Sequence, residues 1–257
     1  MIIMTKDGSV PGSVALITGG SRGIGLETAR QLGQRGFTVV LGARNQEKGE
    51  QAAQTLRSEG LKAESVQLGV ADADDRRAVH DYFARRHKKL DVLINNAAVW
   101  LESPSASDAT PNRTSTISWK VLQQTFDINF FGPVLLTQLM LPLIRAAPAG
   151  RIVNVSSIHA SLTLHSDPTS VVYHHKPFAY AASKSALNAF TVQLAHELRE
   201  TPIKVNSAHP GWVRTQMGGQ SALLDTVQGS WTSVHLATLP PDGPTGGYFF
   251  LEESLPW

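Results

Sequence analysis

The sequence TGGSRGIG, residues 18–25, directly follows the short apolar run Val14–Thr18 and precedes Leu26–Gln34, whose apolar residues recur three and four positions apart. Such glycines let the chain turn sharply from a strand into a helix, and a backbone without Cβ atoms can approach a pyrophosphate. The helix N-terminus then offers free N–H groups and a partial positive charge to that anion. We therefore predict a dinucleotide-binding turn. A glycine-rich turn without a ligand is the alternative, and the strand before it and helix after it argue against that.

The same alternation of apolar patterns continues along the chain and predicts the fold class. Later helical spacing is found in Val121–Arg145 and Phe178–Glu200. Alternating strands and helices predict an α/β protein: a Rossmann-type, doubly wound parallel sheet of about seven strands with helices on both faces. The strands should be apolar on both sides because both faces are covered. The predicted strands are Val14–Thr18, Thr38–Leu41, Ala63–Leu68, Val92–Ile94, Ile152–Val155, Ile203–Ser207 and Tyr248–Leu251.

No break in composition divides the chain, so we predict a single domain over residues 1–257. Its cofactor half is expected at about 12–150 and its catalytic and substrate half at about 151–257. Glu102–Ser118 and Leu162–Pro177 do not fit the alternation and are predicted to be irregular. Long loops inside a compact domain are usually functional.

Composition excludes several classes of site and partner. The absence of cysteine removes disulfides, zinc–thiolate sites, iron–sulfur clusters and a cysteine nucleophile. The net charge of +2 is not gathered in a basic run, so nucleic acid is not an expected partner. Only four apolar residues precede Thr5, and no apolar run approaches the ~18 residues that span a bilayer. We expect a soluble, cytoplasmic protein without a membrane partner.

No metal site is expected from the sequence. His174 and His175 lack a third ligand at metal spacing, and we interpret them as loop residues. Asp72, Asp74 and Asp75 lack the glycine and the distal glutamate of a calcium loop. Acidic residues at a helix N-terminus are stabilising without a metal.

The end of the second predicted strand indicates which dinucleotide binds. An NAD site usually has an acidic residue there, which binds the ribose 2′-hydroxyl. This chain has Arg44 and Asn45 instead, with no carboxylate before Glu47, and Arg22 adds a second cation within the glycine turn. A guanidinium attracts and matches the oxygens of a 2′-phosphate. We therefore predict NADP, used as NADPH. A solvated surface arginine is the alternative for either residue alone.

Tyr180 and Lys184 form a candidate proton-transfer pair at the start of the helix that follows Pro177. Residues four apart share a helix face. A free tyrosine has a pKa of about 10 and is a poor catalyst near neutrality. A nearby ammonium stabilises the phenolate, so we expect Lys184 to lower the pKa of Tyr180.

Two serines follow the apolar run Ile152–Val155, at the strand end where ligands bind in parallel sheets. A hydroxyl there can donate a hydrogen bond to a substrate carbonyl. Ser157 and Ser156 are both candidates, and a serine pair that merely caps the next segment is the alternative. Asn129 lies in the middle of a predicted helix although asparagine is a poor helix former.

These motifs together resemble the short-chain dehydrogenase/reductase family, over roughly Val14 to Thr215. The signature T-G-x-x-x-G-x-G is met at every fixed position, and Tyr180 and Lys184 match its Y-x-x-x-K. The resemblance implies that Ser157 is the catalytic serine, that Asn129 bends its helix and supports a water chain to the lysine, and that Lys184 also binds the nicotinamide ribose. The implied catalytic residues are Asn129, Ser157, Tyr180 and Lys184. The implied cofactor-binding residues are Gly19, Ser21, Arg22, Gly23, Ile24, Gly25, Arg44, Asn45, Asn96, Ala97, Tyr180, Lys184, Pro210, Gly211, Val213 and Thr215.

The chain departs from the family pattern at two places. The acidic residue expected after the third strand, near the adenine, is replaced by Gly69 before Val70, so that Asp72 or the backbone would have to take its place. The usual N-N-A-G ends in Ala98 instead of glycine.

The phrases from Pro210 to Gly219 and from Pro241 to Phe250 resemble the carbonyl reductase branch of the family. That branch implies NADPH-dependent reduction of a ketone, aldehyde or quinone by a monomer or homodimer. Trp100, His159 and Trp212 are the predicted substrate pocket, whose aromatic character favours an apolar substrate. A 3-oxoacyl thioester reductase and an alcohol dehydrogenase are the alternatives among enzymes. A non-enzymatic NADP-binding regulator is the alternative outside them, although such proteins tend to lose the tyrosine or the lysine.

Overall fold

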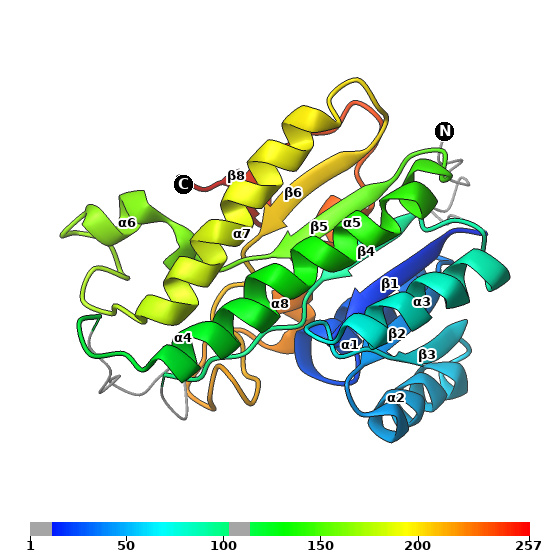
Figure 1. Cartoon of the computed structure of the whole chain (residues 1–257), viewed down its shortest axis with the longest axis horizontal. Coiled ribbons are helices and arrows are strands. Elements are labelled where there is room, and N and C mark those ends of the chain that lie inside the picture. Colours follow the sequence, from blue (N-terminus) through cyan, green and yellow to red (C-terminus); the bar gives the residue numbers. More distant parts are fainter. Residues whose placement is uncertain (1–11, 103–113) are drawn as a thin grey trace.

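The structure is a computed structural model that describes residues 12–102 and 114–257. One eight-stranded sheet has the order β3-β2-β1-β4-β5-β6-β7-β8 (Figure 1). Its strands are parallel except for the pair β7 and β8, which is antiparallel. The strands are β1 Val14–Thr18, β2 Thr38–Ala43, β3 Ala63–Gln67, β4 Val92–Asn95, β5 Arg151–Val155, β6 Lys204–Ala208, β7 Tyr248–Phe250 and β8 Glu253–Ser254.

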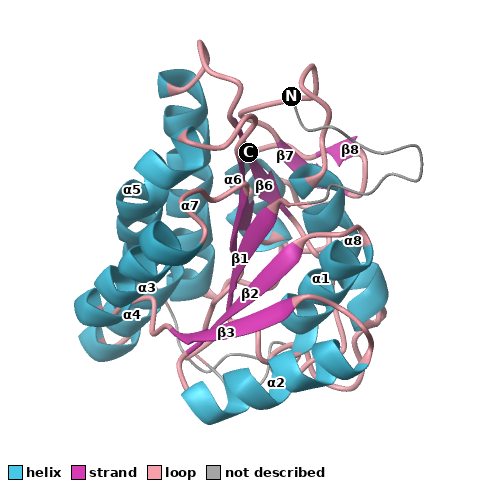
Figure 2. Ribbon diagram, turned by 90° about the vertical axis from the view of Figure 1, so that its right-hand side faces the viewer, coloured by secondary structure: helices cyan, strands magenta, loops and turns pink. Residues whose placement is uncertain are grey.

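Helices cover both faces of this sheet (Figure 2). Strand β1 shows how the sequence builds the two layers, because its successive side chains point to opposite faces. Ala15 and Ile17 join the core under α1, α2 and α8, whereas Val14 and Leu16 join the core under α3, α5 and α7. The helices are α1 Gly23–Gln34, α2 Gln46–Ser58, α3 Ala73–Arg86, α4 Trp119–Phe126, α5 Gly132–Arg145, α6 Leu162–Ser166, α7 Phe178–Glu197 and α8 Thr226–Ala237.

The doubly wound α/β prediction is confirmed, with local differences. The eighth strand, β8, was not predicted, because two polar residues carry no apolar pattern. Strand β3 is not apolar on both sides: it lies at the sheet edge, where Glu64 and Ser65 are half-buried. The predicted irregular segment Leu162–Pro177 contains the short helix α6. Helix α8, which begins with a capping box between Asp225 and Gln228, was also not predicted.

The predicted helix Val121–Arg145 is in fact three consecutive pieces. Helix α4 is followed by a π-helical turn, Asp127–Phe131, and then by α5. Within the described residues, the stretch Trp119–Arg145 is the one long and apolar enough to cross a membrane, with a mean hydropathy of 1.4 over an 18-residue window. Leu136, Met140 and Ile144 of α5 are fully buried in the core against the sheet. The apolar composition of α5 is thus used in packing.

The strand order places the loops after β1 and β4 next to each other. Strand β1 pairs with β2 on one side and with β4 on the other, so the chain crosses to the opposite half of the sheet between β3 and β4. In open parallel sheets, ligands bind outside the carboxyl ends of the strands at this switch point. The glycine turn and the segment after β4 lie at this point.

Candidate active site

The glycine turn between β1 and α1 requires glycine for both conformation and space. Gly19 and Gly23 have φ angles of +66° and +57°, in the left-handed region that residues with a Cβ rarely adopt. A Cβ on Gly25 would lie 2.5 Å from the side-chain nitrogen of Asn96 and 2.5 Å from the carbonyl oxygen of Gly19. Gly25 is therefore needed for the close packing of the turn against Asn96, in the segment after β4.

The turn also leaves the N-terminus of α1 available to an anion. No described side chain caps this helix end, and its first turn has no acidic residue. The first N–H groups of a helix have no intrahelical partner and carry a partial positive charge. An uncapped helix end next to a strand-to-helix glycine turn fits the pyrophosphate of a dinucleotide. Gly23, Ile24 and Gly25 would hold it there, with Ser21 in the turn beside them.

Replacing Gly25 by alanine is expected to destabilise the protein by about 1–3 kcal/mol, because the new methyl group overlaps Asn96 and Gly19. The dissociation constant for NADPH should rise at least ~10-fold, because the turn and the segment after β4 must move apart. Thermal unfolding and a fluorescence titration with NADPH measure both effects.

Gly33→Ala is the matched control in the same helix. Its Cβ would meet the Leu61 side chain, with 3.2 Å to Cδ1, and that side chain can shift. The control should leave NADPH binding unchanged. Unchanged NADPH binding by Gly25→Ala would contradict this role of the glycine.

Two predicted cofactor segments lie against the glycine turn. The backbone N–H groups of Asn96 and Ala97 donate to Thr18 Oγ1, both at 2.9 Å, and Asn96 Nδ2 donates to the Thr18 carbonyl at 2.8 Å. From the other side, Thr215 Cγ2 lies 3.5 Å from the Cβ position of Gly23, and the Arg22 guanidinium hydrogen-bonds to Gln216. The structure therefore brings together the turn, the segment after β4 and the segment 210–216.

The segment 210–213 is fixed by its own packing. Gly211 has a φ of +82°, and Val213 is buried against Gly229. The ring Nδ1 of His209 accepts from the backbone N–H of Ile158 at 3.2 Å and of Gly211 at 3.3 Å. Burial lowers the pKa of His209 to about 4, so the ring is neutral at pH 7 and its nitrogen can accept. Pro210 and Gly211 are thereby linked to the segment after β5.

Arg44 and Asn45 directly follow β2 and differ in their surroundings. Arg44 is exposed, and the ion pairs among the described residues do not include it. Asn45 caps α2, since its Oδ1 accepts from the backbone N–H of Lys48 at 2.8 Å. Arg44 is thus available to a phosphate, whereas the side-chain oxygen of Asn45 already has a structural partner.

Asp75, and not the predicted Asp72, places its carboxylate beside Gly69. Asp75 Oδ2 accepts from the Gly69 N–H at 2.7 Å. Asp72 instead caps α3, accepting from the N–H groups of Asp74 and Asp75 at 2.8 and 2.9 Å. Asp72 is occupied as a helix cap. Asp75 is therefore the acidic side chain at Gly69, the position where the family pattern has an acidic residue near the adenine.

Ser157, Tyr180 and Lys184 come together between β5 and α7. Tyr180 is hydrogen-bonded to Ser157, and the Lys184 ammonium lies 5.8 Å from the centre of the Tyr180 ring. Lys184 Nζ donates to the carbonyl of Val155 at 2.6 Å, which ties α7 to the end of β5. Ser157 also caps the 3₁₀ turn Ile158–Ala160. Of the two candidate serines, Ser157 is therefore the one hydrogen-bonded to Tyr180, whereas the hydroxyl of Ser156 is buried without a described partner.

Burial affects the pKa values of Tyr180 and Lys184 more than the attraction between the two side chains does. It raises the pKa of Tyr180 to about 12, although the hydrogen bond to Ser157 lowers it. It lowers the pKa of Lys184 to about 7. The pKa of Tyr180 is therefore raised, whereas the sequence predicted that it is lowered. Taking both side chains out of water disfavours their charged forms. The tyrosine therefore carries its proton at neutral pH.

Asn129 lies in the π-helical turn Asp127–Phe131 and is fully buried. Its Oδ1 accepts from the N–H of Val99 at 2.8 Å, and its Nδ2 donates to the Val99 carbonyl at 3.0 Å and to Ser183 Oγ at 3.1 Å. The mid-helix asparagine thus marks a real irregularity. It joins the segment after β4 to the helix that carries Tyr180 and Lys184.

Two of the three predicted pocket residues lie beside Tyr180. The ring centre of Trp100 is 4.6 Å from that of Tyr180, and the ring centre of His159 is 6.5 Å from it. His175, interpreted as a loop residue, joins this wall by stacking on Trp100 at 5.7 Å. Trp212 is 41% exposed, and its indole N–H donates to the Gly218 carbonyl at 2.8 Å. No contact between Trp212 and Tyr180 is described.

Sequence reasoning missed three residues that support the site. Tyr248 is buried, and its hydroxyl donates to the Ser157 carbonyl at 2.5 Å. His209 links the segments after β5 and β6, as described above. Glu102 accepts from the N-terminal backbone of α7. No local pattern distinguishes these residues, because their partners lie far away in the sequence.

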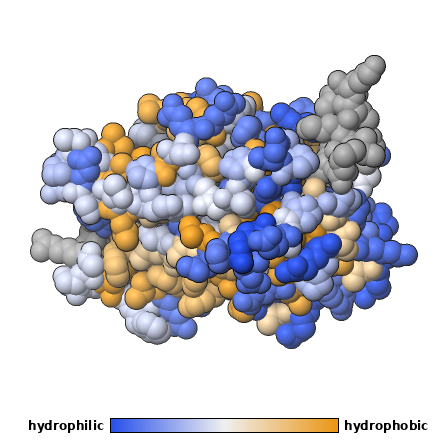
Figure 3. All heavy atoms as spheres, turned by 90° about the horizontal axis from the view of Figure 1, so that it is seen from above, coloured by the Kyte–Doolittle hydropathy of each residue, from blue (hydrophilic) through white to orange (hydrophobic). Residues whose placement is uncertain are grey.

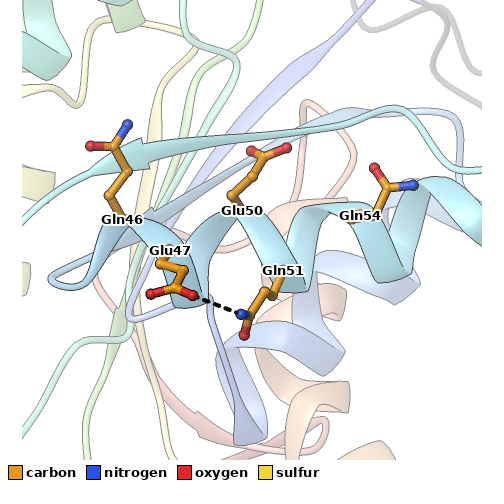
Figure 4. Close-up of a pocket in the computed structure, with 5 residues that line it drawn as sticks. All are labelled: Gln46, Glu47, Glu50, Gln51 and Gln54. Carbon is orange, nitrogen blue, oxygen red and sulfur yellow. Dashed lines mark hydrogen bonds between the residues drawn. The ribbon is translucent and has the colours of Figure 1, made fainter.

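A hollow of about 500 Å³ lies on the surface of α2 and is lined by five side chains that Figure 4 labels: Gln46, Glu47, Glu50, Gln51 and Gln54. Its carboxylates have neighbours of their own: Glu47 accepts from Gln51 at 3.4 Å, and Glu50 bonds to Ser65 and Arg57. None of these residues is a predicted site residue. Across the described residues, no group of three His, Asp or Glu side chains could hold a metal ion.

Comparison with known proteins identifies the family. The sequence model of the short chain dehydrogenase family matches residues 13–223. Carbonyl reductase [NADPH] 1 of Homo sapiens is 34% identical, over 91% of this chain and 95% of that protein. Retinol dehydrogenase 12 of Mus musculus is 32% identical, over 99% of this chain and 82% of that protein.

Solved structures agree with these relatives. An NADPH-bound carbonyl reductase from chicken fatty liver superimposes with a TM-score of 0.81 and 26% identity, covering 96% of this chain and 99% of that one. Salutaridine reductase from Papaver somniferum has a TM-score of 0.79 and 26% identity, covering 93% and 99%. The predicted resemblance is confirmed: the chain belongs to the short-chain dehydrogenase family of oxidoreductases, in its carbonyl reductase-like branch.

Proposed function

We propose that this protein reduces a ketone, aldehyde or quinone carbonyl with NADPH. When bound, NADPH supplies the hydride for the carbonyl carbon. The observation that carries the proposal is the buried group of Ser157, Tyr180 and Lys184 on the segments that follow β5 and begin α7. An assay of NADPH oxidation at 340 nm against a panel of carbonyl compounds tests it. If the protein reduces none of these carbonyl compounds, the proposal is contradicted.

The three side chains divide the work on the carbonyl oxygen. Tyr180 donates the proton: its phenol is protonated at neutral pH, and a positive charge on Lys184 beside it would stabilise the phenolate that the transfer leaves. Ser157, hydrogen-bonded to Tyr180, also holds the oxygen and polarises the carbonyl. Lys184, bonded to the end of β5, adds positive charge beside the phenol when protonated and would bind the nicotinamide ribose. The aromatic wall of Trp100 and His159 lies beside Tyr180 and would help to exclude water once a substrate is bound.

The preference for NADP is proposed on the basis of Arg44. Its exposed guanidinium follows β2, where an NAD site would have a carboxylate. The uncapped N-terminus of α1 accommodates the pyrophosphate, and Arg22 lies at its start. The similar carbonyl reductases of Mus musculus and Homo sapiens are named as NADPH enzymes, which supports the same preference.

Replacing Arg44 by aspartate is expected to raise the KM for NADPH by about 10- to 100-fold, because a charge-assisted phosphate contact becomes a repulsion. The KM for NADH should change little. Steady-state kinetics with both cofactors measure the difference. Lys48→Asp, another exposed residue nearby in the sequence, changes the net charge equally and serves as the control. Equal changes for NADPH and NADH in Arg44→Asp would refute this role.

An apolar substrate is proposed from the surroundings of Tyr180. Large exposed apolar side chains lie on the loops that carry Trp100 and Trp212, at the start of α6 and in the segment before α7: Leu101, Leu162, Val171 and Trp212. Figure 3 shows apolar residues gathered at the end of the molecule where α4, α6 and the start of α7 lie in Figure 1. A hydrophobic aryl ketone or quinone should therefore be reduced faster than a phosphorylated carbonyl. Reduction of charged substrates alone would contradict this.

Oxidation of an alcohol is the second candidate function, favoured by relatives named retinol dehydrogenase. The same groups serve both directions, because a proton donor for reduction is the acceptor for oxidation. Rates measured with NADPH and a carbonyl, and with NADP⁺ and the matching alcohol, distinguish the two. A 3-oxoacyl thioester in the same panel tests the remaining alternative.

A further inference from the structure

The helix that carries Tyr180 obtains its N-terminal cap from a distant residue. Pro177 stands at the N-cap of α7 and provides no side-chain hydrogen bond. Instead, Glu102 Oε1 accepts from the backbone N–H of Ala179, and Glu102 Oε2 accepts from the backbone N–H of Tyr180, both at 2.9 Å. Each carboxylate oxygen thus has its own donor, and one donor belongs to Tyr180.

Glu102 is only 3% exposed, so its charge must be compensated inside the protein. The N-terminus of a twenty-residue helix provides this compensation through its free N–H groups and its partial positive charge. The carboxylate also acts on the neighbouring His175: it raises the pKa of that ring, while burial, the larger effect, lowers it. Glu102 is therefore a buried anion seated between the helix end and the aromatic wall.

The segment that carries Glu102 contacts Tyr180 at a second point. Trp100, two residues earlier, packs its ring 4.6 Å from the Tyr180 ring. One residue before that, both backbone groups of Val99 are hydrogen-bonded to Asn129. Residues 99–102 are thus fixed at Asn129 and then hold Tyr180 by its ring and by its backbone N–H.

We propose that Glu102 is a positioning residue, which sets the first turn of α7 and thereby the place of the Tyr180 phenol relative to Ser157. Glu102 itself does not touch the reacting atoms; it acts through Tyr180. The inference rests on the proposed role of Tyr180 as proton donor. Loss of one bond to the helix end leaves the phenol free to sample positions in which proton donation is slower.

The test is a double-variant cycle of Glu102→Gln and Tyr180→Phe. Glutamine keeps the size of the side chain, but its NH₂ group cannot accept from a backbone N–H. In the otherwise unchanged protein, Glu102→Gln should lower kcat by about 10- to 100-fold with the dissociation constant of NADPH within about twofold. In the Tyr180→Phe background the same substitution should lower the residual rate by less than about twofold, because the phenol it positions is absent.

Two further measurements separate positioning from general stability. Glu64→Gln is the matched control: this half-buried carboxylate bonds to Tyr82 and Arg86, away from α7. It should change kcat by less than about twofold, even if the melting temperature falls. The solvent deuterium isotope effect on kcat should be larger in Glu102→Gln than in the unchanged protein, because proton donation becomes slower.

Each outcome decides between the accounts. An equal loss of rate in both backgrounds, no loss at all, an unaltered isotope effect, or failure of Glu102→Gln to fold would overturn the positioning role and leave Glu102 as a structural cap. Full activity of Tyr180→Phe alone would instead overturn the proposed role of Tyr180 as proton donor, and the absence of turnover with every carbonyl of the panel would overturn the proposed function itself. The two failures are therefore distinguishable.

Discussion

Replacing Tyr180 by phenylalanine is expected to lower kcat for carbonyl reduction by about 10²- to 10⁴-fold, the range that general acid catalysis contributes. The substitution removes one oxygen atom from a buried side chain, and the ring can keep its packing against Trp100. The KM for NADPH should change by less than about threefold, since the glycine turn and Arg44 are untouched. Initial rates of NADPH oxidation at saturating substrate measure the effect.

Tyr82→Phe is the control for loss of a tyrosine hydroxyl elsewhere. That hydroxyl bonds to Glu64 between α3 and β3, so its removal affects stability but not turnover. The kcat of this control should stay within about twofold of the unchanged protein. A Tyr180→Phe protein with a kcat close to that of the control would show that another group donates the proton.

Replacing Lys184 by methionine is expected to lower kcat by about 10²-fold or more, because the charge beside the phenol and the ribose contact are both lost. The KM for NADPH should also rise. Methionine fills most of the space of the buried chain and removes the cost of burying an amine. It also leaves the Val155 carbonyl without its donor, a cost of about 1–3 kcal/mol. Because the two effects oppose each other, the melting temperature should shift by less than about 5 °C.

The pH profile gives a second test of Lys184. Burial lowers its pKa to about 7, so the ammonium loses its proton as the pH rises through about 7. If the charged form assists the reaction, the rate of the unchanged protein falls above that pH. Lys184→Met should have a low rate without this decline. The same decline in both proteins would assign it to another group, and a kcat within about threefold of the unchanged protein would contradict the role of Lys184.

Local sequence patterns were sufficient for the parallel sheet and the glycine turn. The run Val14–Thr18 is buried on both faces, and its neighbour Gly25 leaves room for Asn96, so composition and spacing carry the information directly. The serine, tyrosine and lysine were found because their motifs are local. They meet because α7 packs against the end of β5, where Lys184 Nζ donates to the carbonyl of Val155.

Contacts between distant residues could not be predicted in this way. Glu102 stood in a polar segment that indicated only a loop, and its partners lie 77 and 78 positions further on. The bond from Tyr248 to the Ser157 carbonyl joins residues 91 positions apart. The direction of the Tyr180 pKa depended on burial, which spacing on a helix does not report. These features follow from tertiary packing and have no local signal.

The most direct test of the account follows the hydride. NADPH deuterated at C4, on one face and then on the other, would be incubated with the protein and an aryl ketone, and the alcohol examined by mass spectrometry and NMR. We expect one deuterium on the carbinol carbon from one of the two labelled cofactors, and the rate at which it appears should fall by about 10²- to 10⁴-fold in Tyr180→Phe. NADPH consumption with no deuterium at that carbon from either cofactor would contradict carbonyl reduction at this site.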